Sequence, residues 1–397
     1  MTIWIFNHYA QGPNLPGGTR HYDIAKELTD RGHSVTIFAS GFHYSLLKHS
    51  VEYNNKGYLI EDINGVKFIW VKTTAYKKNN IFRMLNIVSY FFKIRSVLPK
   101  LNLNKPDVII GSTVHPFAPL IASRFAQQYN VPFIFEIRDL WPQTFIDMGI
   151  WTNNSIKSRL FKAIEYLTVS KADRIIILSP LTLNYLAEEY AYPQKDILLL
   201  PNGVNEKFIQ KSRQSINLPI SITYVGGIDS VHGLDFLIDL ADALRSEDII
   251  FNIYGNGKEK TRLLTLSEKK NLSNIIWHDS IPKDEVPSKL SEANLLLLST
   301  ANVLYGSENK LYEYMASAKP IIFATSGMHN NPLDEVKCGL AIDKDDISQS
   351  AHKIKEFIAK QSEQFDILGM NGQRYVLEYR TIKVLVNKLE SFLKGIM

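Results

Sequence analysis

Apolar runs of strand length alternate with segments of helical periodicity along most of this chain, in two successive cycles. In the first cycle the apolar runs are WIFN, VTIF, VIIG, FIFE and RIIIL. Helical periodicity occurs near His21 to Arg31, from Pro116, and near Ser155 to Ser170. Strands that are apolar throughout and separated by helices are typical of a parallel sheet covered on both faces. The pattern predicts an α/β fold with a doubly wound, Rossmann-like sheet.

An insertion interrupts this first cycle. In the segment GYLIEDINGVKFIWVK, the dipeptide Asn64-Gly65 lies between two strand patterns. Asn-Gly is favoured in two-residue hairpin loops, because both central positions of the turn need a positive φ. We therefore expect a β-hairpin here.

A second cycle begins after PNGVNEKF, at Pro201 to Phe208, and its apolar runs are SITYVG, IIFNIYG, NIIWH, LLLLS and PIIFA. The chain has 397 residues, more than the roughly 250–300 that a single core usually supports. We expect two domains, residues 1–203 and 204–377, followed by an amphipathic helix at about residues 378–397. Two such sheets facing each other would bring the carboxyl ends of their strands to one central cleft, where α/β sheets bind ligands.

The sequence contains no apolar run long enough to cross a bilayer, and a strand-like TIWIF follows Met1 at once. Its single cysteine, Cys338, excludes an internal disulfide and fits a reducing compartment. We expect a cytoplasmic protein without an export signal or a spanning helix.

Basic side chains are concentrated between Asp62 and Asp107, where no acidic residue occurs. Within this stretch, residues 76–101 mix cations with apolar and aromatic residues, which suits shallow contact with anionic lipid. The alternative is a core-facing helix with a basic solvent side. Nucleic acid is the competing anion, but no recognisable binding module accompanies the stretch. The predicted membrane contacts are Lys77, Lys78, Arg83, Lys93 and Arg95.

The segment GSENKLYEYMASAKPIIF, from Gly306 to Phe323, places a lysine and a glutamate at a helix start beside a buried strand. Lys310 offers a cation for phosphate, and Glu313, on the same helical face, offers a carboxylate for sugar hydroxyls. The alternative is that both are solvated first-turn residues of a surface helix.

KLYEYMASAKPII resembles the nucleotide-binding segment of the retaining GT-B glycosyltransferases of family 4. The resemblance implies that Glu313 holds the ribose of a donor nucleotide and that Lys310 holds its diphosphate. Tyr305 stands where the family has a further glutamate, and Ala318 replaces the usual glycine. The donor-binding residues implied are Gly17, Gly18, Gly226, Gly227, His278, Gly306, Ser307, Glu308, Asn309, Lys310, Leu311 and Glu313.

Loops of the first domain carry further matches to the family. Gly17 and Gly18 precede a helix, where backbone N–H groups can approach an anion. His115, in STVHPFAPL, resembles a family histidine beside the donor sugar, and we expect it to hydrogen-bond the sugar. EIRDLWP resembles a branch that includes L-fucosamine transferases; charged residues after its buried strand form either an internal ion pair or an acceptor site. The acceptor-binding residues predicted are Arg20, Glu136, Arg138 and Asp139, and the catalytic ones are His115, Asp139 and Lys310.

The second domain departs from the family at two expected phosphate-binding cations. In YVGGIDSVHGLDFL, Gly227 stands at the family's arginine and His232 at its lysine. Lys310 would then carry more of the diphosphate charge, together with the backbone near Gly226. In YGNGKEKTRL, the glycines Gly255 and Gly257 are expected to form a turn.

The resemblance implies a GT-B fold, with an acceptor-binding first domain, a donor-binding second domain and a terminal helix that crosses back to the first. It implies a retaining, metal-independent glycosyltransferase without a cofactor. We expect a nucleotide-diphosphate sugar donor, with UDP and an N-acetylated amino sugar as the first choices. The acceptor would be a polyprenyl-diphosphate-linked sugar in O-antigen or capsule assembly, reached from the cytoplasmic face of the inner membrane. The alternatives are a sugar-nucleotide epimerase of the same architecture and a non-catalytic two-domain sugar-binding protein.

Overall fold

The computed structural model describes residues 1–15, 17–53, 55–78, 81–210, 218–300, 307, 309–326 and 332–396. It divides the chain into two compact units. Unit 1 contains Met1–Pro201 and Ile382–Met397, and unit 2 contains Asn202–Leu304 and Glu308–Thr381, while Ser307 groups with unit 1. Each unit is described separately below.

Unit 1 is built on a sheet with the strand order β10-β9-β8-β7-β1-β2-β6-β5. All neighbours are parallel except β5 and β6. Its strands are β1 (Thr2–Phe6), β2 (Ser34–Ser40), β5 (Tyr58–Ile63), β6 (Val66–Val71), β7 (Val108–Ser112), β8 (Phe133–Ile137), β9 (Arg174–Ile177) and β10 (Ile197–Leu199). Its helices are α1 (Arg20–Asp30), α2 (Ile81–Val97), α3 (Phe117–Tyr129), α4 (Gln143–Asp147), α5 (Ile156–Val169), α6 (Pro180–Tyr190) and α14 (Ile382–Lys394). A short antiparallel pair, β3 (Phe42–His43) and β4 (Lys48–His49), follows β2.

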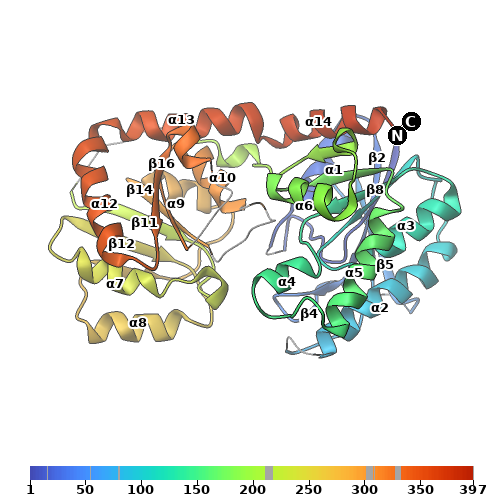
Figure 1. The fold of residues 1–397 in the computed structure, drawn as a ribbon, viewed down its shortest axis with the longest axis horizontal. Helices are drawn as coiled ribbons and strands as arrows, with labels where there is room; N and C mark the ends of the chain where they lie inside the picture. Colours follow the sequence, from blue (N-terminus) through green and yellow to red (C-terminus); the bar gives the residue numbers. More distant parts are fainter. Residues whose placement is uncertain are drawn as a thin grey trace. The chain divides into compact units, whose positions relative to one another are not determined.

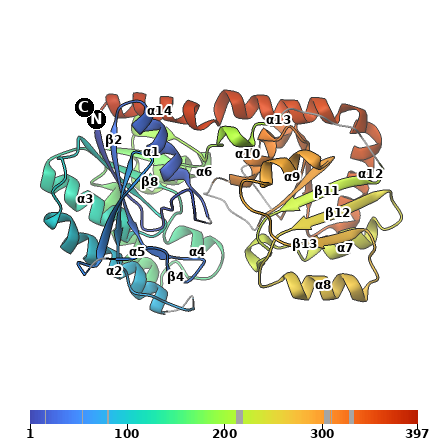
Figure 2. The ribbon, with the colours of Figure 1, turned by 180° about the vertical axis from the view of Figure 1, so that it is seen from behind.

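The two faces of this sheet are covered by different helices. Trp4 and Phe6 point to the face that packs against α2 and α3, whereas Ile3 and Ile5 point to the face that packs against α1 and α14. This alternation follows from the two-residue period of a strand. Figure 1 and Figure 2 show α1 beside α14, and α2 beside α3, in agreement with their contacts. The expected Rossmann-like sheet is confirmed.

The predicted hairpin is also confirmed. β5 and β6 pair antiparallel from Tyr58–Val71 to Ile63–Val66. Asn64 has φ 53° and Gly65 has φ 87°, so both turn residues adopt the left-handed conformation that Asn-Gly tolerates best.

Unit 2 contains a second parallel sheet with the strand order β13-β12-β11-β14-β15-β16. Helices α7, α8 and α12 contribute to the core on one face, and α9, α10 and α13 to the core on the other (Figure 2). Its strands are β11 (Ile220–Val225), β12 (Ile249–Tyr254), β13 (Ile275–His278), β14 (Leu295–Ser299), β15 (Ile321–Thr325) and β16 (Gly339–Asp343). Its helices are α7 (Phe236–Ala243), α8 (Lys260–Lys269), α9 (Val286–Glu292), α10 (Asn309–Ala316), α11 (Leu333–Val336), α12 (Ile347–Gln361) and α13 (Phe365–Tyr379).

Each sheet has one point at which the strand order changes direction. In unit 1 it lies between β1 and β7, and in unit 2 between β11 and β14. Loops that leave the carboxyl ends of two such strands diverge to opposite faces of the sheet, and ligands of α/β sheets bind between them. The residues that follow these four strands therefore define where a site is expected in each unit.

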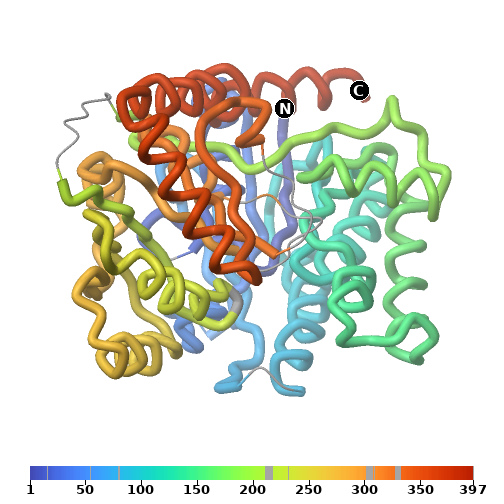
Figure 3. Tube along the Cα trace, turned by 60° about the vertical axis from the view of Figure 1, so that its left-hand side comes forward, coloured from blue at the N-terminus to red at the C-terminus, as the bar shows by residue number. Residues whose placement is uncertain are grey.

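Two helices form the terminal segment, and the second of them, α14, lies within the range expected for the terminal helix, about 378–397. α13 ends at Tyr379 and belongs to unit 2, and α14 begins at Ile382 and belongs to unit 1. Between them, Thr381 forms a β-bridge with Val204. In unit 1 the guanidinium of Arg174 donates to the backbone oxygens of Phe392 and Gly395. The N-terminal strand and α14 thus belong to one folded unit, as the tube in Figure 3 shows.

In the part of the chain that the structure describes, no helix is both long enough and apolar enough to pass through a bilayer.

Candidate functional site

Lys310 lies at the carboxyl end of β11 in unit 2. Its ammonium nitrogen is 3.5 Å from the Tyr224 hydroxyl and 5.2 Å from the centre of the Tyr224 ring. A Cβ atom built on Gly226, directly after the strand, would lie 2.1 Å from this nitrogen. The structure therefore brings together Lys310 and the Gly226 backbone, which the sequence places more than eighty residues apart.

Tyr314 holds α10 in this position. The Val225 N–H donates to the Tyr314 hydroxyl over 3.0 Å, and the hydroxyl donates to the Val225 carbonyl over 3.2 Å. The tyrosine is buried and lies four residues after Lys310, so both project from one helical face. Sequence reasoning missed this residue; its signal was a tyrosine one turn beyond the lysine, next to a buried strand.

Glu313 is half-buried on the same helix. Of the neighbouring residues predicted to bind the donor, Asn309 is exposed, Ser307 is half-buried, and Leu311 is buried in the apolar core. The Leu311 side chain therefore packs inward, and its predicted donor contact stays a prediction. Gly306 and Glu308, like Tyr305, lie outside the described residues.

A second lysine lies near His232 in the loop after β11. His232 ends a short 3-10 helix, Ser230–His232. Burial lowers its pKa to about 4, with smaller contributions from the charges of Lys310 and Lys344 and an opposing one from Asp229. The Lys344 ammonium donates to the Ser299 hydroxyl over 3.2 Å and would lie 3.1 Å from a Cβ atom at Gly233. Lys344 follows β16, far along the chain, so no local motif pointed to it.

The turn after β12 approaches the loop after β11 closely. A Cβ atom at Gly255 would lie 1.9 Å from the Gly226 carbonyl oxygen, and one at Gly257 would lie 2.1 Å from the Ile228 oxygen. A side chain at either position would collide with the backbone of the neighbouring loop, so both positions require glycine. This agrees with the turn that was predicted for them. His278, at the end of β13, stacks on Tyr254 with ring centres 4.1 Å apart. The two rings form a stacked surface at the carboxyl edge, and the predicted contact of His278 with the base stays a prediction.

In unit 1, His115 pairs with a second histidine at the point where the strand order changes. His8 follows β1 and His115 follows β7; Nδ1 of His8 lies 2.6 Å from Nε2 of His115. The His8 ring also stacks on Tyr90, with ring centres 4.6 Å apart. Both histidines are fully buried. Burial is the main cause that lowers both pKa values, for His115 to about 3, so both rings are neutral at physiological pH.

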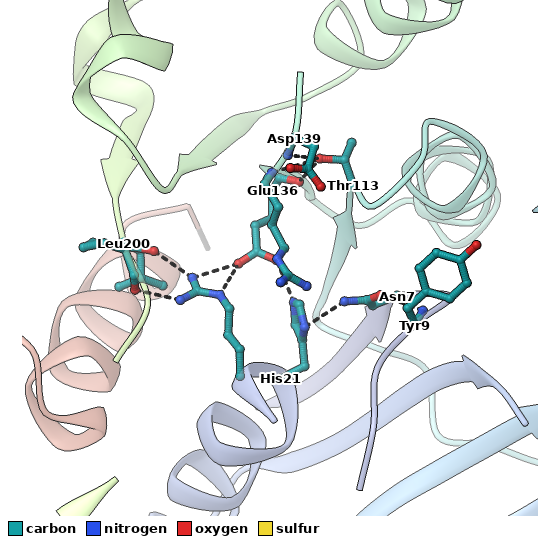
Figure 4. Close-up of polar contacts among 10 residues, drawn as sticks. Asn7, Tyr9, His21, Thr113, Glu136, Asp139 and Leu200 are labelled. Carbon is teal, nitrogen blue, oxygen red and sulfur yellow. Dashed lines mark hydrogen bonds and ion pairs between the residues drawn. The ribbon is translucent and has the colours of Figure 1, made fainter. Parts of the chain in front are cut away.

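Arg20 and Glu136 form an internal ion pair. The Arg20 guanidinium donates to Oε1 of Glu136 over 3.0 and 2.9 Å and also to the carbonyls of Leu200 and Pro201. His21 Nε2 lies 2.6 Å from Oε2 of Glu136 (Figure 4). The opposing charges hold the pKa of Glu136 well below its usual range against the effect of burial. The sequence left open whether the charged residues of this loop form an internal ion pair or an acceptor site. For Glu136 the geometry matches the internal ion pair. Contact of Arg20 and Glu136 with an acceptor stays a prediction.

Thr113 joins the loops that carry His115 and Asp139. Its backbone N–H donates to the Glu136 carbonyl over 2.9 Å, and its hydroxyl accepts from the Arg138 N–H over 2.9 Å (Figure 4). Asp139 is exposed, yet the protein atoms around its carboxyl raise its pKa, with Arg138 opposing. Arg138 forms no ion pair with any residue that the structure describes. Its pairing with Asp139 is therefore not seen, and a phosphate contact stays the prediction.

Residue 17 has a backbone conformation that residues other than glycine rarely adopt. Gly17 has φ +113°, and a Cβ atom there would lie 3.1 Å from the Tyr44 hydroxyl. Gly18 is exposed just before α1. The backbone at Gly17 and Gly18 is exposed, as an anion-binding loop requires.

Family models account for nearly the whole chain. Residues 17–208 match the Glycosyltransferase Family 4 model, and residues 205–394 match the Glycosyl transferases group 1 model. The chain is a glycosyltransferase of the family 4 type.

Individual relatives agree with this assignment. The putative colanic acid biosynthesis glycosyl transferase WcaI of Escherichia coli K12 is 23% identical over 72% of this chain and 74% of its own. Sucrose-phosphate synthase from Thermosynechococcus elongatus has a similar fold, with a TM-score of 0.75, 16% identity, and coverage of 99% and 98% of the two chains. Anabaena HepE, solved in complex with UDP-glucose, has a TM-score of 0.68, 13% identity and full coverage of both chains. The fold of this glycosyltransferase is GT-B, as predicted.

The basic stretch of this glycosyltransferase is not uniform. Lys77, Lys78, Lys93 and Arg95 are exposed, whereas Arg83 is half-buried. The charge of Arg83 contributes to the lowered pKa values of His8 and His115. Arg83 therefore faces the histidine pair, which the sequence pattern of a basic surface did not reveal. Exposed apolar side chains on the same helix are Ile81, Phe82, Leu85 and Phe92.

Proposed function

We propose that this glycosyltransferase moves a sugar from a nucleotide-diphosphate sugar to a lipid-diphosphate-linked sugar acceptor, with retention of configuration and without a metal ion. The observation that carries the proposal is the position of Lys310 against the Gly226 backbone, at the carboxyl end of β11. A lysine held over half-buried glycine backbone at the carboxyl edge of an α/β sheet suits a diphosphate.

On the donor side, Lys310 would bind the diphosphate as it leaves, and Glu313 would accept hydrogen bonds from the ribose hydroxyls. Charge stabilisation of a leaving diphosphate needs more than one cation when no metal takes part. Lys344 supplies a second one close to Gly233 and His232. We infer that Lys344 replaces the charge lost at Gly227 and His232. The neutral His232 adds a hydrogen-bonding group rather than a charge.

On the acceptor side, no side chain of the described residues is placed as an obvious general base. The neutral His115 is suited to hydrogen-bond a sugar hydroxyl, and Asp139 is the exposed carboxylate beside it in the Thr113-linked loops. In the proposed mechanism the leaving phosphate accepts the proton of the attacking hydroxyl on the same face of the sugar. Retention follows from this same-face geometry.

The choice of UDP and of a surface polysaccharide rests on relatives. Anabaena HepE has been solved with UDP-glucose, and WcaI of Escherichia coli carries the description of a colanic acid biosynthesis enzyme. We extend both properties to this chain, with an acceptor in O-antigen or capsule assembly. The exposed cations and apolar side chains of α2 support contact with an anionic membrane surface, where such an acceptor is found.

The test is a nucleotide titration without metal. Purified protein is heated with UDP, GDP or ADP, and the shift of its unfolding temperature is measured. We expect one nucleotide, UDP, to stabilise the wild type, because a ligand that binds only the folded state raises its stability. Glu313→Ala should abolish this shift and leave the unfolding temperature without nucleotide unchanged. The matched control is Glu268→Ala, on an exposed face of α8, which should behave as the wild type.

Two outcomes would contradict the proposal. If no nucleotide shifts the wild type, or if Glu313→Ala retains full affinity by calorimetry, the donor site is not where we place it. An epimerase would bind the same nucleotide but would not release nucleoside diphosphate when an acceptor is added, so acceptor-dependent release separates the two enzyme classes.

A further inference from the structure

Arg83 and three ring side chains gather at the carboxyl edge of the first sheet, where the strand order changes. His8 and Tyr9 follow β1, His115 follows β7, and Arg83 lies on the first turn of α2. The rings of Tyr9 and His115 are 5.8 Å apart and nearly perpendicular. The charge of Arg83 acts on Tyr9 and on both histidines. These four residues are called the Arg83 cluster below.

The Arg83 cluster contains buried polar atoms without partners. Nε2 of His8, Nδ1 of His115 and Nε of Arg83 are buried and make no hydrogen bond in the described structure. Both histidines are completely buried. A buried polar group without a partner costs free energy, and such groups are rare in folded proteins. Several of them converging on one place indicate a ligand that would satisfy them together.

No carboxylate of the described residues neutralises Arg83. It forms no ion pair in the part of the chain that the structure describes. The buried carboxylate of β8, Glu136, is already bound by Arg20 and His21. The two histidines are neutral and hydrogen-bonded to each other, so one of their two outer nitrogens carries a proton and the other is an acceptor. The Arg83 guanidinium, the protonated outer nitrogen and the Tyr9 hydroxyl are the donors available to an oxyanion, which can accept two parallel N–H bonds from arginine.

We propose that the Arg83 cluster binds an oxyanion carried by a substrate of the transfer reaction. The oxyanion is either a phosphate of the lipid diphosphate or the carboxylate of an acidic sugar; both present the same charged oxygens to Arg83. This inference rests on the proposed glycosyl transfer for the identity of the substrate, but the binding of an anion does not depend on it. Arg83 then has a role different from that of its exposed neighbours on the same helix.

The experiment reads the two histidines directly. Full-length protein labelled with carbon-13 in its histidine rings is titrated with inorganic pyrophosphate, with glucuronate, and with glucose as the uncharged analogue of glucuronate. The ring signals of His8 and His115 are assigned from single His→Gln variants and followed by NMR. The titration is repeated with Lys310→Gln, and a response that depends on Lys310 is assigned to pyrophosphate bound in unit 2.

We expect pyrophosphate or glucuronate, and not glucose, to shift the His8 and His115 signals at saturable concentrations. Arg83→Gln should weaken this binding at least about tenfold, since it removes a charge-assisted hydrogen bond. The matched control Arg95→Gln, an exposed arginine on the same helix, should leave it unchanged. A response to pyrophosphate alone identifies the lipid diphosphate, and a response to glucuronate alone identifies an acidic sugar.

The absence of any response to both anions in the wild type overturns the proposal, as does full binding by Arg83→Gln. The nucleotide titration of Arg83→Gln is run in parallel and should match the wild type, which shows that the variant is folded. If anions bind the Arg83 cluster while no nucleotide stabilises the wild type, the cluster stands and the proposed transferase function fails.

Discussion

The ammonium group of Lys310 occupies the space that a side chain on residue 226 would need. A Cβ atom added to Gly226 would lie 2.1 Å from Nζ of Lys310 and 3.0 Å from its Cε. Gly226 does not have a positive φ, so its backbone conformation is one that alanine also adopts. The glycine is therefore required by the Lys310 side chain and the Tyr224 hydroxyl that pack on it.

Gly226→Ala should displace Lys310 and weaken nucleotide binding while the fold persists. The nearest obstructing atom is Nζ at the flexible end of Lys310, which can rotate away without moving the backbone, whereas the Tyr224 hydroxyl, 2.8 Å from the added Cβ, must shift slightly. We expect a loss of about tenfold or more in affinity, the value of one charge-assisted hydrogen bond, measured by calorimetry with the stabilising nucleotide.

The test of cause is a double-mutant cycle. In a Lys310→Gln background, Gly226→Ala should have little further effect on affinity, because the group that it displaces has lost its charge. Additive losses in the double variant would show that residue 226 acts through something other than Lys310.

Lys344→Gln should also weaken nucleotide binding. The lysine lies beside Gly233 and near His232, in the loop where the family resemblance implies two cations that this sequence lacks, and glutamine retains the ability to donate to Ser299. We expect a severalfold to tenfold loss in affinity, whereas Lys269→Gln, an exposed lysine on α8, should cause none. Equal affinities of Lys344→Gln and the wild type would leave Lys310 as the main phosphate cation of the unit.

The fold could be predicted from the sequence because buried parallel strands are apolar throughout and are separated by helices of regular length. The same logic placed the start of the terminal helix at about residue 378, whereas α14 begins at Ile382, after a break at Thr381. A helical period does not reveal that the chain passes from one folded unit to another.

Sequence reasoning proposes a candidate site where one segment carries the chemistry, as with Lys310 and Glu313, whose roles stay predictions. It was not predictable where the partners come from distant strands. His8, Tyr314 and Lys344 each acquire a role only through the order of strands in the sheets. Arg20 and Glu136 were recognised as important charges, but the sequence could not decide between substrate contact and the internal ion pair that they form.

Glu165 predicts a pH dependence of stability. It is buried on α5 and accepts hydrogen bonds from Tyr185 over 2.7 Å and from Tyr190 over 2.6 Å. Burial raises its pKa from 4.5 to about 7. The folded state therefore holds this proton more tightly than the unfolded state does. The contribution of Glu165 to stability is complete below pH 4.5 and is lost as the pH rises to about 7.

Glu165→Gln should remove this loss of stability at high pH, because glutamine does not ionise. Relative to the wild type, its free energy of unfolding should improve by about 3 kcal/mol between about pH 4.5 and about pH 8, at roughly 1.36 kcal/mol per pKa unit. Urea unfolding at several pH values measures the difference. The exposed neighbour Glu188→Gln serves as the control and should show the pH dependence of the wild type; a constant difference between Glu165→Gln and the wild type would contradict the raised pKa.

The four exposed cations of the basic stretch should account for membrane binding, and Arg83 should not contribute to it. Lys77, Lys78, Lys93 and Arg95 are exposed near the apolar side chains Phe82 and Phe92, and a basic residue near an anionic surface contributes about 1 kcal/mol. Replacing all four with glutamine should lower the partition onto anionic liposomes by about a thousandfold, measured by flotation at physiological salt.

A variant with Lys258, Lys269, Lys283 and Lys355 changed to glutamine has the same net charge and should still float with the vesicles. If the first variant floats as well as the wild type does, the membrane contact lies elsewhere, and the exposed apolar residues of α5, such as Ile156 and Leu160, become the next surface to test.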